Sequence, residues 1–338
     1  MTKNNDKYRQ RNHRGGAIAQ QSIAFDFDDA IFDDETTFAS APHTEQPAQP
    51  KAATTGSDEQ GQQWHFASFG SGSSGNCAFL GNEHEGVLID AGVNPDLVFP
   101  VLERNGVRPH MVKGIILTHD HADHVRYAYK IVRQYKHMRI YCTPKLLRGV
   151  LMHHNVSRRI RDYHEQVFKE IPFKLAGMTI TAFETSHDAF DNMGFSIEAG
   201  DKRFVVGTDM GVITDRAAHY MAQAHYLMIE SNYDDAMLTH GTYPEYLKAR
   251  VRGPQGHLDN VVAAQFVAQH YHEGLKYVFL CHLSNDNNTP QRALDTMTEA
   301  LEQRGLTVGD GSNSLGQRDR DIQVYALPRF DPSLWFVL

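Results

Sequence analysis

The sequence predicts a layered domain of helices and sheets, of the α/β or α+β class, over residues 62–338. Two observations predict this class. Short apolar runs of strand length come in long sequential groups. Stretches in which apolar residues recur at helical spacing lie between these groups. Strands and helices in this arrangement are typical of sheets that are covered by helices.

In chain order, the strand-like runs are apolar, short and bounded by turn residues. They lie near residues 64–69, 77–81, 86–90, 114–118, 138–142, 178–184, 194–199, 202–208, 225–230, 276–282 and 322–327. The helical patterns lie near residues 94–105, 122–137, 144–153, 215–223, 243–252, 258–272 and 290–304. In the segment 258–272, for example, Val262, Phe266 and Gln269 keep helical spacing.

A glycine- and serine-rich loop, residues 70–75, separates the first two strand-like runs. Its glycines fit the dinucleotide-binding pattern G-x-G-x-x-G, but that pattern requires a helix to begin at the loop. Residues 76–83 instead indicate a strand and a turn, followed by a second strand that ends at Asp90. The loop therefore fits either a tight turn between strands or a turn whose N–H groups contact a substrate phosphate.

The first 61 residues differ from the rest of the chain because they are rich in polar residues, Ala and Pro. Such a segment buries too little apolar area to offset the entropy of ordering it. Residues 1–61 are therefore predicted to be a disordered extension of the folded domain at 62–338. Within the extension, residues 25–34 mix aromatic and acidic side chains, which fits either a docking motif for a protein partner or a solvated tail.

Neither a signal peptide nor a membrane-spanning segment is expected, because no apolar run has the required length. The three cysteines, Cys77, Cys142 and Cys281, are odd in number and far apart. They suit packing in a reducing compartment better than they suit disulfides. These features predict a soluble cytoplasmic protein.

The densest group of polar side chains is residues 118–124, Thr-His-Asp-His-Ala-Asp-His, directly after an apolar run. In a core, each of these imidazoles and carboxylates would need a hydrogen-bond partner, and charged imidazoles would repel one another. A divalent cation removes both difficulties, since it binds neutral imidazole and carboxylate directly. Residues i and i+2 of an extended backbone point the same way, so His119 and His121 can bind one ion. Asp123 and His124 follow where a helix begins and can face a neighbouring position.

The pattern H-x-H-x-D-H after a strand resembles that of the metallo-β-lactamase superfamily of metal-dependent hydrolases. The other residues that this resemblance requires occur in the right order, each after an apolar run or in a turn. They are Asp90, His187, Asp209 and His282. The resemblance covers residues 64–330 and implies an αββα sandwich with a dinuclear metal site at the edge of its sheets.

The resemblance also implies which residues bind each of two divalent ions. The first ion would be held by His119, His121 and His187. The second would be held by Asp123, His124 and His282. Zinc is the expected metal and manganese the alternative. Both are favoured over iron, because His121 stands where oxygen-reducing diiron relatives have Glu.

Asp209 would bridge the two ions. Ions roughly 3.5–4 Å apart can share a water, lower its pKa and stabilise both oxygens of an in-line displacement. The expected nucleophile is therefore a hydroxide that bridges the metals, and Asp123 is expected to serve catalysis as well as binding. Asp90 is expected behind the ligands, where it would orient a metal-binding histidine.

Five short motifs resemble the WalJ/YycJ family more specifically. They are residues 71–77, 230–234, 241–244, 256–260 and 282–288. Members of this family resemble DNA-directed nucleases, so the resemblance implies a 5′-to-3′ DNA exonuclease. Glu230 and His257 are similar to an accessory pair that helps the leaving oxygen take up a proton. Asp259 and Asn285 depart from the family pattern, which has Ser and a basic residue there.

Other functions of the same fold remain open. The class B β-lactamase pattern has a Cys at the second ion, but here Cys281 precedes His282 on a strand and should point to the opposite face. Thioesterases and lactonases of the glyoxalase type share the full ligand set. The non-enzymatic alternative is a metal-stabilised adaptor that works through residues 1–61, although a scaffold does not need an open dinuclear site.

The chain has a net charge of −8, so its overall charge does not favour binding to DNA, which is also negatively charged. Residues 104–170 differ, with 14 Lys and Arg against 5 Asp and Glu. Within them Arg126, Lys130 and Arg133 recur at helical spacing and are predicted to share one helix face. This stretch fits either a solvated face or a groove that follows phosphates. The candidate substrate contacts are Ser73, Asn76 and Arg126.

Overall fold

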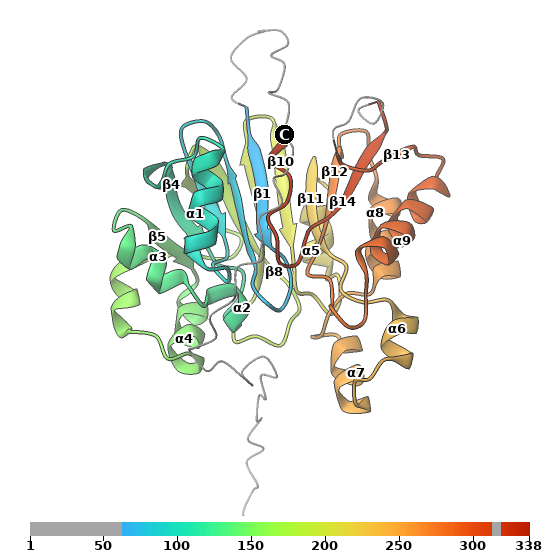
Figure 1. The fold of residues 1–338 in the computed structure, drawn as a ribbon, viewed down its shortest axis with the longest axis horizontal. Coiled ribbons are helices and arrows are strands. Elements are labelled where there is room, and N and C mark those ends of the chain that lie inside the picture. The colour runs from blue at the N-terminus through green and yellow to red at the C-terminus, as the bar shows by residue number, and fades with distance from the viewer. Residues whose placement is uncertain (1–62, 313–318) are drawn as a thin grey trace, which may run out of the picture. The chain divides into compact units, whose positions relative to one another are not determined.

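The computed structural model describes residues 63–312 and 319–338, which are drawn in colour in Figure 1. The predicted extension, residues 1–61, and its candidate docking motif lie outside the described residues. Within them, the strands form two sheets of seven and eight strands.

The first sheet has the strand order β15-β1-β2-β3-β4-β5-β6. Its strands are β1 (His65–Gly70), β2 (Cys77–Gly81), β3 (Gly86–Ile89), β4 (Val112–Ile116), β5 (Arg139–Cys142), β6 (His164–Gln166) and β15 (Phe336–Val337). The pairs β1–β2 and β2–β3 are antiparallel, whereas β3, β4, β5 and β6 are mutually parallel. The carboxyl ends of these parallel strands therefore meet at one edge of the sheet.

The second sheet has the strand order β13-β14-β12-β11-β10-β9-β8-β7. Its strands are β7 (Phe173–Leu175), β8 (Met178–Glu184), β9 (Met193–Ala199), β10 (Lys202–Gly207), β11 (Tyr226–Glu230), β12 (Tyr277–Cys281), β13 (Val308–Gly309) and β14 (Ile322–Ala326). The neighbours β10, β11, β12 and β14 are parallel. Their carboxyl ends form a second common edge.

Most of the α-helices in the described residues begin at a residue whose side chain satisfies a free backbone N–H group. Thr143, Thr214, Asp259 and Thr289, for example, each accept a hydrogen bond from the first turn of the following helix. The α-helices are α1 (Pro95–Arg104), α2 (Ala122–Val125), α3 (Ala128–Gln134), α4 (Pro144–His153), α5 (Asp215–Met221), α6 (Asp235–His240), α7 (Glu245–Arg252), α8 (Asn260–His270) and α9 (Pro290–Glu302). None of the helices in the described part of the chain combines the length and the apolar character of a membrane span.

The two sheets face each other across an aromatic core. The ring of Phe66 on β1 lies 4.8 Å from that of Phe204 on β10 and 4.6 Å from that of Phe279 on β12. Phe336 on β15 closes the cluster, 4.9 Å from Phe279. All four rings are buried, which removes a large apolar area from water.

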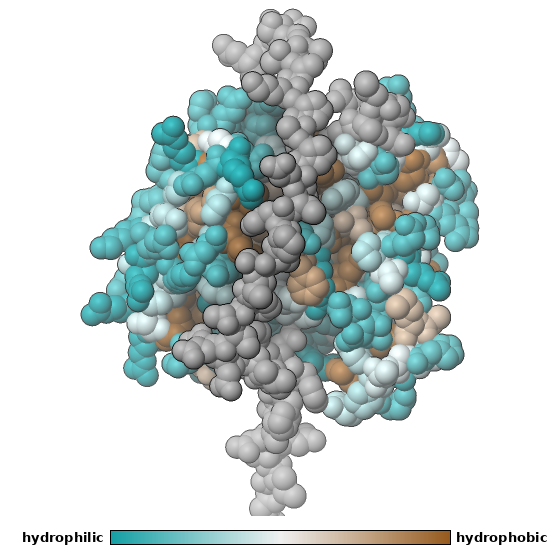
Figure 2. Space-filling view, viewed as in Figure 1, coloured by the Kyte–Doolittle hydropathy of each residue, from teal (hydrophilic) through white to brown (hydrophobic). Residues whose placement is uncertain are grey.

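Helices cover the outer faces of both sheets. In Figure 1, α1, α3 and α4 lie on the side of the first sheet, and α8 and α9 lie on the side of the second. The space-filling view in Figure 2 shows hydrophilic side chains over much of these outer helices. The arrangement is the four-layer αββα sandwich that the sequence predicted.

Most predicted elements agree with the structure within a few residues, but the helix predicted over 122–137 is wrong. It is divided into α2 and α3, because the backbone N–H of Tyr127 donates to the carbonyl of Ala91 at 2.9 Å and not to the preceding turn. Arg126 follows α2, whereas Lys130 and Arg133 belong to α3. These three cations therefore do not lie along one continuous helix.

The sequence did not predict β6, β7, β13, β15 or α6. The four strands have only two or three residues each, and α6 has six. A period of two or of 3.6 residues cannot be recognised over so short a segment.

Candidate metal centre

Three polar residues that follow strands share an unusual backbone conformation. Asp90 after β3, Asp209 after β10 and His282 after β12 have φ angles of 60°, 51° and 51°. Residues with a side chain rarely adopt this left-handed region, and those that do are concentrated at functional sites. The sharp turn at each strand end directs these three side chains towards the same edge of the sandwich.

The first candidate cluster consists of His119, His121 and His187. One nitrogen of each ring lies within 4.8 Å of the others, and Nε2 of His187 is 3.3 Å from Nδ1 of His121. Nδ1 of His187 lies 2.9 Å from the carbonyl oxygen of Gly256, which fixes the ring. Nε2 of His119 is buried and has no hydrogen-bond partner among the described residues. A buried, unpaired imidazole nitrogen beside two others fits a divalent cation.

The second candidate cluster consists of Asp123, His124 and His282. One Asp123 oxygen lies 3.4 Å from Nε2 of His124 and 3.4 Å from Nε2 of His282. All three side chains are buried. Two imidazoles and a carboxylate at these separations are a set of ligands that zinc and manganese accept.

Asp209 lies between the two clusters. Its Oδ2 is 3.4 Å from Nε2 of His124, and its Oδ1 is 3.3 Å from Nδ1 of His282. On the other side, Oδ1 is 3.9 Å from Nε2 of His187. A single carboxylate thus reaches residues of both clusters, which is the position that a bridging ligand requires.

Asp90 lies behind the second cluster and is fully engaged by hydrogen bonds. Its Oδ2 is 2.8 Å from Nδ1 of His124. Its two oxygens also accept from the N–H and the hydroxyl of Thr118 at 2.8–3.0 Å. This carboxylate therefore holds the ring of His124 so that Nε2 faces the cluster, as carboxylates behind metal-binding histidines commonly do.

The backbone of the ligand loop packs directly on the loop after β3. A Cβ atom at Gly92 would lie 1.5 Å from the carbonyl oxygen of Asp123. The neighbouring N–H of Ala91 donates to the carbonyl of His124 at 2.7 Å. Only glycine permits this approach, so Gly92 positions the two ligands of the second cluster.

Burial and neighbouring charges shift the pKa values of the histidines in opposite directions in the two clusters. Burial lowers the pKa of His119 well below its usual value and lowers that of His187 to about 4. For His282, burial is outweighed by Asp209, Asp123 and Glu230, which raise its pKa to about 10. Burial is likewise outweighed at His124, whose pKa is raised chiefly by Asp123. Without metal, His119 and His187 therefore favour the neutral form, whereas His124 and His282 favour the protonated form.

Glu230 ends β11 beneath His257. The carboxylate is fully buried, and its Oε1 lies 2.7 Å from Nδ1 of His257. It also accepts from the backbone N–H groups of Met210 at 2.7 Å and Leu258 at 3.1 Å. The His257 side chain is 22% exposed, and its Nδ1 lies 3.8 Å from Asp209. His257 therefore borders the candidate centre from the solvent side.

The three candidate substrate contacts differ in position. Asn76 is buried, and its amide lies 2.9 Å from both Asp123 Oδ2 and His124 Nε2, so it belongs to the interior of the centre. Ser73 lies on the adjoining loop and is partly exposed. Arg126 is exposed and directly follows α2, the helix that carries Asp123 and His124.

Two further acids at the centre were not predicted as site residues. Asp120 is buried, lies 2.8 Å from Nδ1 of His153 and accepts the backbone N–H of Phe190 at 2.8 Å. It thereby connects the metal motif to the loop that carries His187. Asp188 lies 3.6 Å from Nε2 of His187 and accepts from Nε of Arg250 at 2.7 Å. The only sequence signal for either acid is that it adjoins a candidate ligand.

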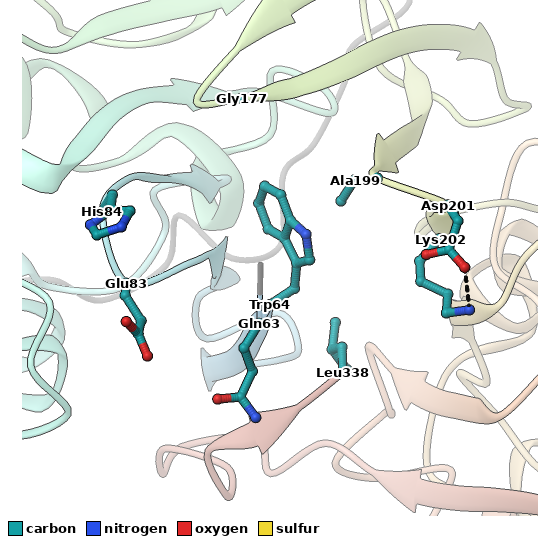
Figure 3. Close-up of a pocket in the computed structure, with 10 residues that line it drawn as sticks. Gln63, Trp64, Glu83, His84, Gly177, Ala199, Asp201, Lys202 and Leu338 are labelled. Carbon is teal, nitrogen blue, oxygen red and sulfur yellow. Dashed lines mark hydrogen bonds and ion pairs between the residues drawn. The ribbon is translucent and has the colours of Figure 1, made fainter. Parts of the chain in front are cut away.

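A hollow of about 950 Å³ lies elsewhere, around Trp64 and between the turn that holds Glu83 and His84 and the turn that holds Asp201 and Lys202 (Figure 3). Lys202 begins β10, whereas Asp209 follows the end of that strand. The hollow is therefore at the opposite strand ends from the candidate centre.

Residues 86–282 match the family described as Beta-lactamase superfamily domain. This span includes both clusters, Asp90 and Asp209. The chain belongs to the metallo-β-lactamase superfamily. The predicted superfamily is confirmed, and together with the exodeoxyribonuclease relatives described next it identifies the protein as an enzyme, a metal-dependent hydrolase.

Within the superfamily, the chain is similar to the exodeoxyribonuclease YycJ of Bacillus anthracis. The two are 30% identical over 247 residues, which is 73% of this chain and 92% of the relative. The exodeoxyribonuclease WalJ of Streptococcus pneumoniae is 30% identical over 245 residues, 72% of this chain and 90% of the relative. These relatives confirm the predicted resemblance to the WalJ/YycJ family.

Solved structures of the superfamily share the fold. YhfI of Bacillus subtilis, a metallo-β-lactamase fold protein, matches with a TM-score of 0.58 and 13% identity over 82% of this chain and all of that one. Zinc-bound PqqB of Methylobacterium extorquens matches with a TM-score of 0.57 and 17% identity, over 81% of this chain and all of that one. At such identities the similarity establishes the αββα architecture.

Proposed function

We propose that this metallo-β-lactamase superfamily member is a dinuclear phosphodiesterase that degrades DNA as an exonuclease, in the 5′-to-3′ direction. The observation that carries the proposal is the pair of Glu230 and His257 beside the two candidate clusters, in a chain whose relatives are named exodeoxyribonucleases. A histidine at this place offers a proton donor for the oxygen that leaves a phosphodiester.

The proposed ligands are those of the two clusters. His119, His121 and His187 would hold one ion, Asp123, His124 and His282 the other, and Asp209 both. Divalent ions held there would supply Lewis-acid chemistry, activating water and stabilising charge on the reacting phosphate. Zinc is the proposed metal, with manganese as the alternative, since both accept imidazole and carboxylate ligands.

His257 is proposed as the general acid. Burial lowers its pKa, but the adjacent Glu230 carboxylate outweighs burial, so that the pKa of His257 is raised and the protonated ring is favoured. With Nδ1 directed at Glu230, Nε2 is the ring nitrogen available to a leaving oxygen. Glu230 is fully buried, so it is proposed to orient the His257 ring and to stabilise its protonated form, without contacting the substrate.

The basic stretch 104–170 supports the proposal only in part. Within it, Lys130 pairs with Asp96 at 2.8 Å and Lys169 with Asp191 at 2.8 Å. These cations are therefore partly neutralised. Arg158, Arg159 and Arg161, in the short helix Arg158–Tyr163, are exposed and are the proposed contacts to the phosphates of a bound strand.

The remaining proposals concern the context of the enzyme. The three cysteines are free and buried, which supports a reducing, cytoplasmic location. Residues 1–61 are proposed to be an extension outside the catalytic domain, with residues 25–34 as the contact to a protein partner.

The decisive experiment supplies the metal-loaded protein with single- and double-stranded DNA that carries a label at the 5′ or the 3′ end. Early release of labelled mononucleotides from the 5′ label, with gradual shortening of 3′-labelled strands, is the expected result. The matched control is His119→Ala, which should release nothing. Efficient hydrolysis of thioesters or lactones with labelled DNA left intact would show that the enzyme is a small-molecule hydrolase of the same fold.

A further inference from the structure

Arg329 joins two loops beside the candidate centre. It follows β14, in the segment that returns to the first sheet. Its Nη2 donates to the hydroxyl of Ser73 at 2.7 Å, and its Nη1 donates to the carbonyl of Leu283 at 2.9 Å. The side chain lies against Gly72, where an added Cβ would meet the guanidinium at 3.0 Å. The glycine thus allows the guanidinium to lie flat on the loop.

Both loops that Arg329 joins are bonded to the second cluster. The hydroxyl of Ser71 accepts from the backbone N–H of His282 at 2.9 Å. Asn76, at the other end of the same loop, donates to the carbonyl of Gly72 at 3.0 Å and to Asp123 at 2.9 Å. The guanidinium therefore has a fixed place next to the second cluster, although it is contributed by a residue far away in the sequence.

An aromatic ring adjoins this guanidinium. Phe330 is 65% exposed, and Cζ of Arg329 lies 5.4 Å from the centre of its ring. An exposed phenyl ring next to a cation is a surface on which a nucleic-acid base can stack. A guanidinium beside a hydroxyl is a suitable donor set for a phosphate.

We propose that Arg329, Ser73 and Phe330 form a nucleotide subsite next to the second cluster. The guanidinium and the serine hydroxyl bind the phosphate of the nucleotide that adjoins the scissile bond, and Phe330 stacks on its base. The subsite rests on the proposed nuclease function and adds a specific prediction to it. The enzyme binds an unpaired terminal nucleotide rather than an intact base pair, because a base that stacks on Phe330 must separate from its pairing partner.

The test measures binding of a fluorescent single-stranded oligonucleotide by the metal-loaded full-length protein. Phe330→Ala should weaken binding about 5- to 140-fold, the range for loss of one base–aromatic stack. The loss should disappear on an oligonucleotide whose terminal nucleotides are abasic. Phe168→Ala is the matched control, because Phe168 is 52% exposed but follows β6, the last strand of the first sheet.

Arg329→Gln tests the phosphate contact. Glutamine keeps hydrogen-bond donors for the loops but removes the charge. A plot of log affinity against log salt concentration has a negative slope, and for single-stranded DNA this slope should therefore become less steep by about 0.7. The metal content should stay unchanged. Arg304→Gln is the control, since Arg304 is exposed in the turn after α9 and should leave the slope as it is.

Two results would overturn the subsite. One is an equal loss for Phe330→Ala on normal and abasic oligonucleotides. The other is a salt slope that Arg329→Gln does not change. Either result leaves the nuclease proposal intact if the wild type still degrades labelled DNA. If the wild-type protein neither binds nor degrades DNA, the proposed function fails together with the subsite.

Discussion

The Nδ1 atom of His257 lies 2.7 Å from the buried carboxylate of Glu230, and the same carboxylate oxygen lies 3.3 Å from Nδ1 of His282. One acid therefore touches both the proposed proton donor and a proposed metal ligand. Its burial prevents contact with a substrate, so its influence on the reaction must pass through these two rings.

His257→Ala should keep both metals and slow DNA cleavage about 10²–10⁴-fold, the range for loss of a general acid. Bis(p-nitrophenyl) phosphate should be affected much less, because its leaving group departs without a proton. Metal analysis and rates on both substrates check this. Equal losses on the two substrates would show that His257 has another role.

Substitution of the proposed ligands should change metal content in a site-specific way. His119→Ala or His121→Ala should lower the stoichiometry from two ions per chain to one and abolish hydrolysis. Asp209→Ala should weaken both sites, because Asp209 reaches residues of both clusters. His84→Ala, in an exposed turn far from the centre, is the control. Two ions retained by the Asp209 variant would contradict the bridging role.

Metal binding should release protons mainly from the second cluster. The pKa of His124 is raised well above its usual value, chiefly by Asp123, and acidic neighbours raise the pKa of His282 to about 10. Both rings are therefore charged at pH 7 before metal binds. His119 and His187 have lowered pKa values and are already neutral. Because an ion must displace the protons held by His124 and His282, its affinity at the second cluster should rise with pH more steeply than at the first. Calorimetric titration in buffers of different ionisation enthalpy measures this. Equal release at both steps would refute it.

Gly92→Ala should destabilise the fold by at least the roughly 1–3 kcal/mol that overpacking costs, and should empty the second metal site first. The added methyl group would collide with the carbonyl of Asp123, which is backbone and cannot rotate away. Thermal unfolding and metal analysis provide the readout. Gly253→Ala, where a Cβ would meet its nearest neighbour at 3.2 Å, is the milder comparison.

Removal of residues 1–61 should leave the melting temperature and the turnover of a generic phosphodiester nearly unchanged. The reason is compositional, since these residues supply few apolar side chains for a core. Thermal unfolding of the full-length and truncated proteins is the measurement. A loss above roughly 2 kcal/mol, large against ordinary domain stability, would mean that the segment packs on the domain.

The sequence by itself determined the fold class, and its resemblance to the metallo-β-lactamase superfamily implied the proposed ligands, because the motifs that carry both are local. The longer strands are apolar runs, and each candidate ligand follows such a run directly or lies in a turn, as with Asp209 after β10 and His282 after β12. In an αββα sandwich the ends of those strands meet at a common edge. The resemblance could thus propose one site for residues that are distant along the chain, without coordinates.

Only the tertiary structure decided how these side chains contact one another. It divided the helix predicted over 122–137, because Tyr127 bonds to a carbonyl from the end of another strand. It buried Glu230 beneath His257, and it brought Arg329 from the C-terminal segment to Ser73. Each contact joins segments that are far apart in sequence. Such contacts depend on packing and not on local periodicity, so their geometry could not be predicted from patterns of neighbouring residues, although the motifs had already indicated Glu230 and His257 as a pair.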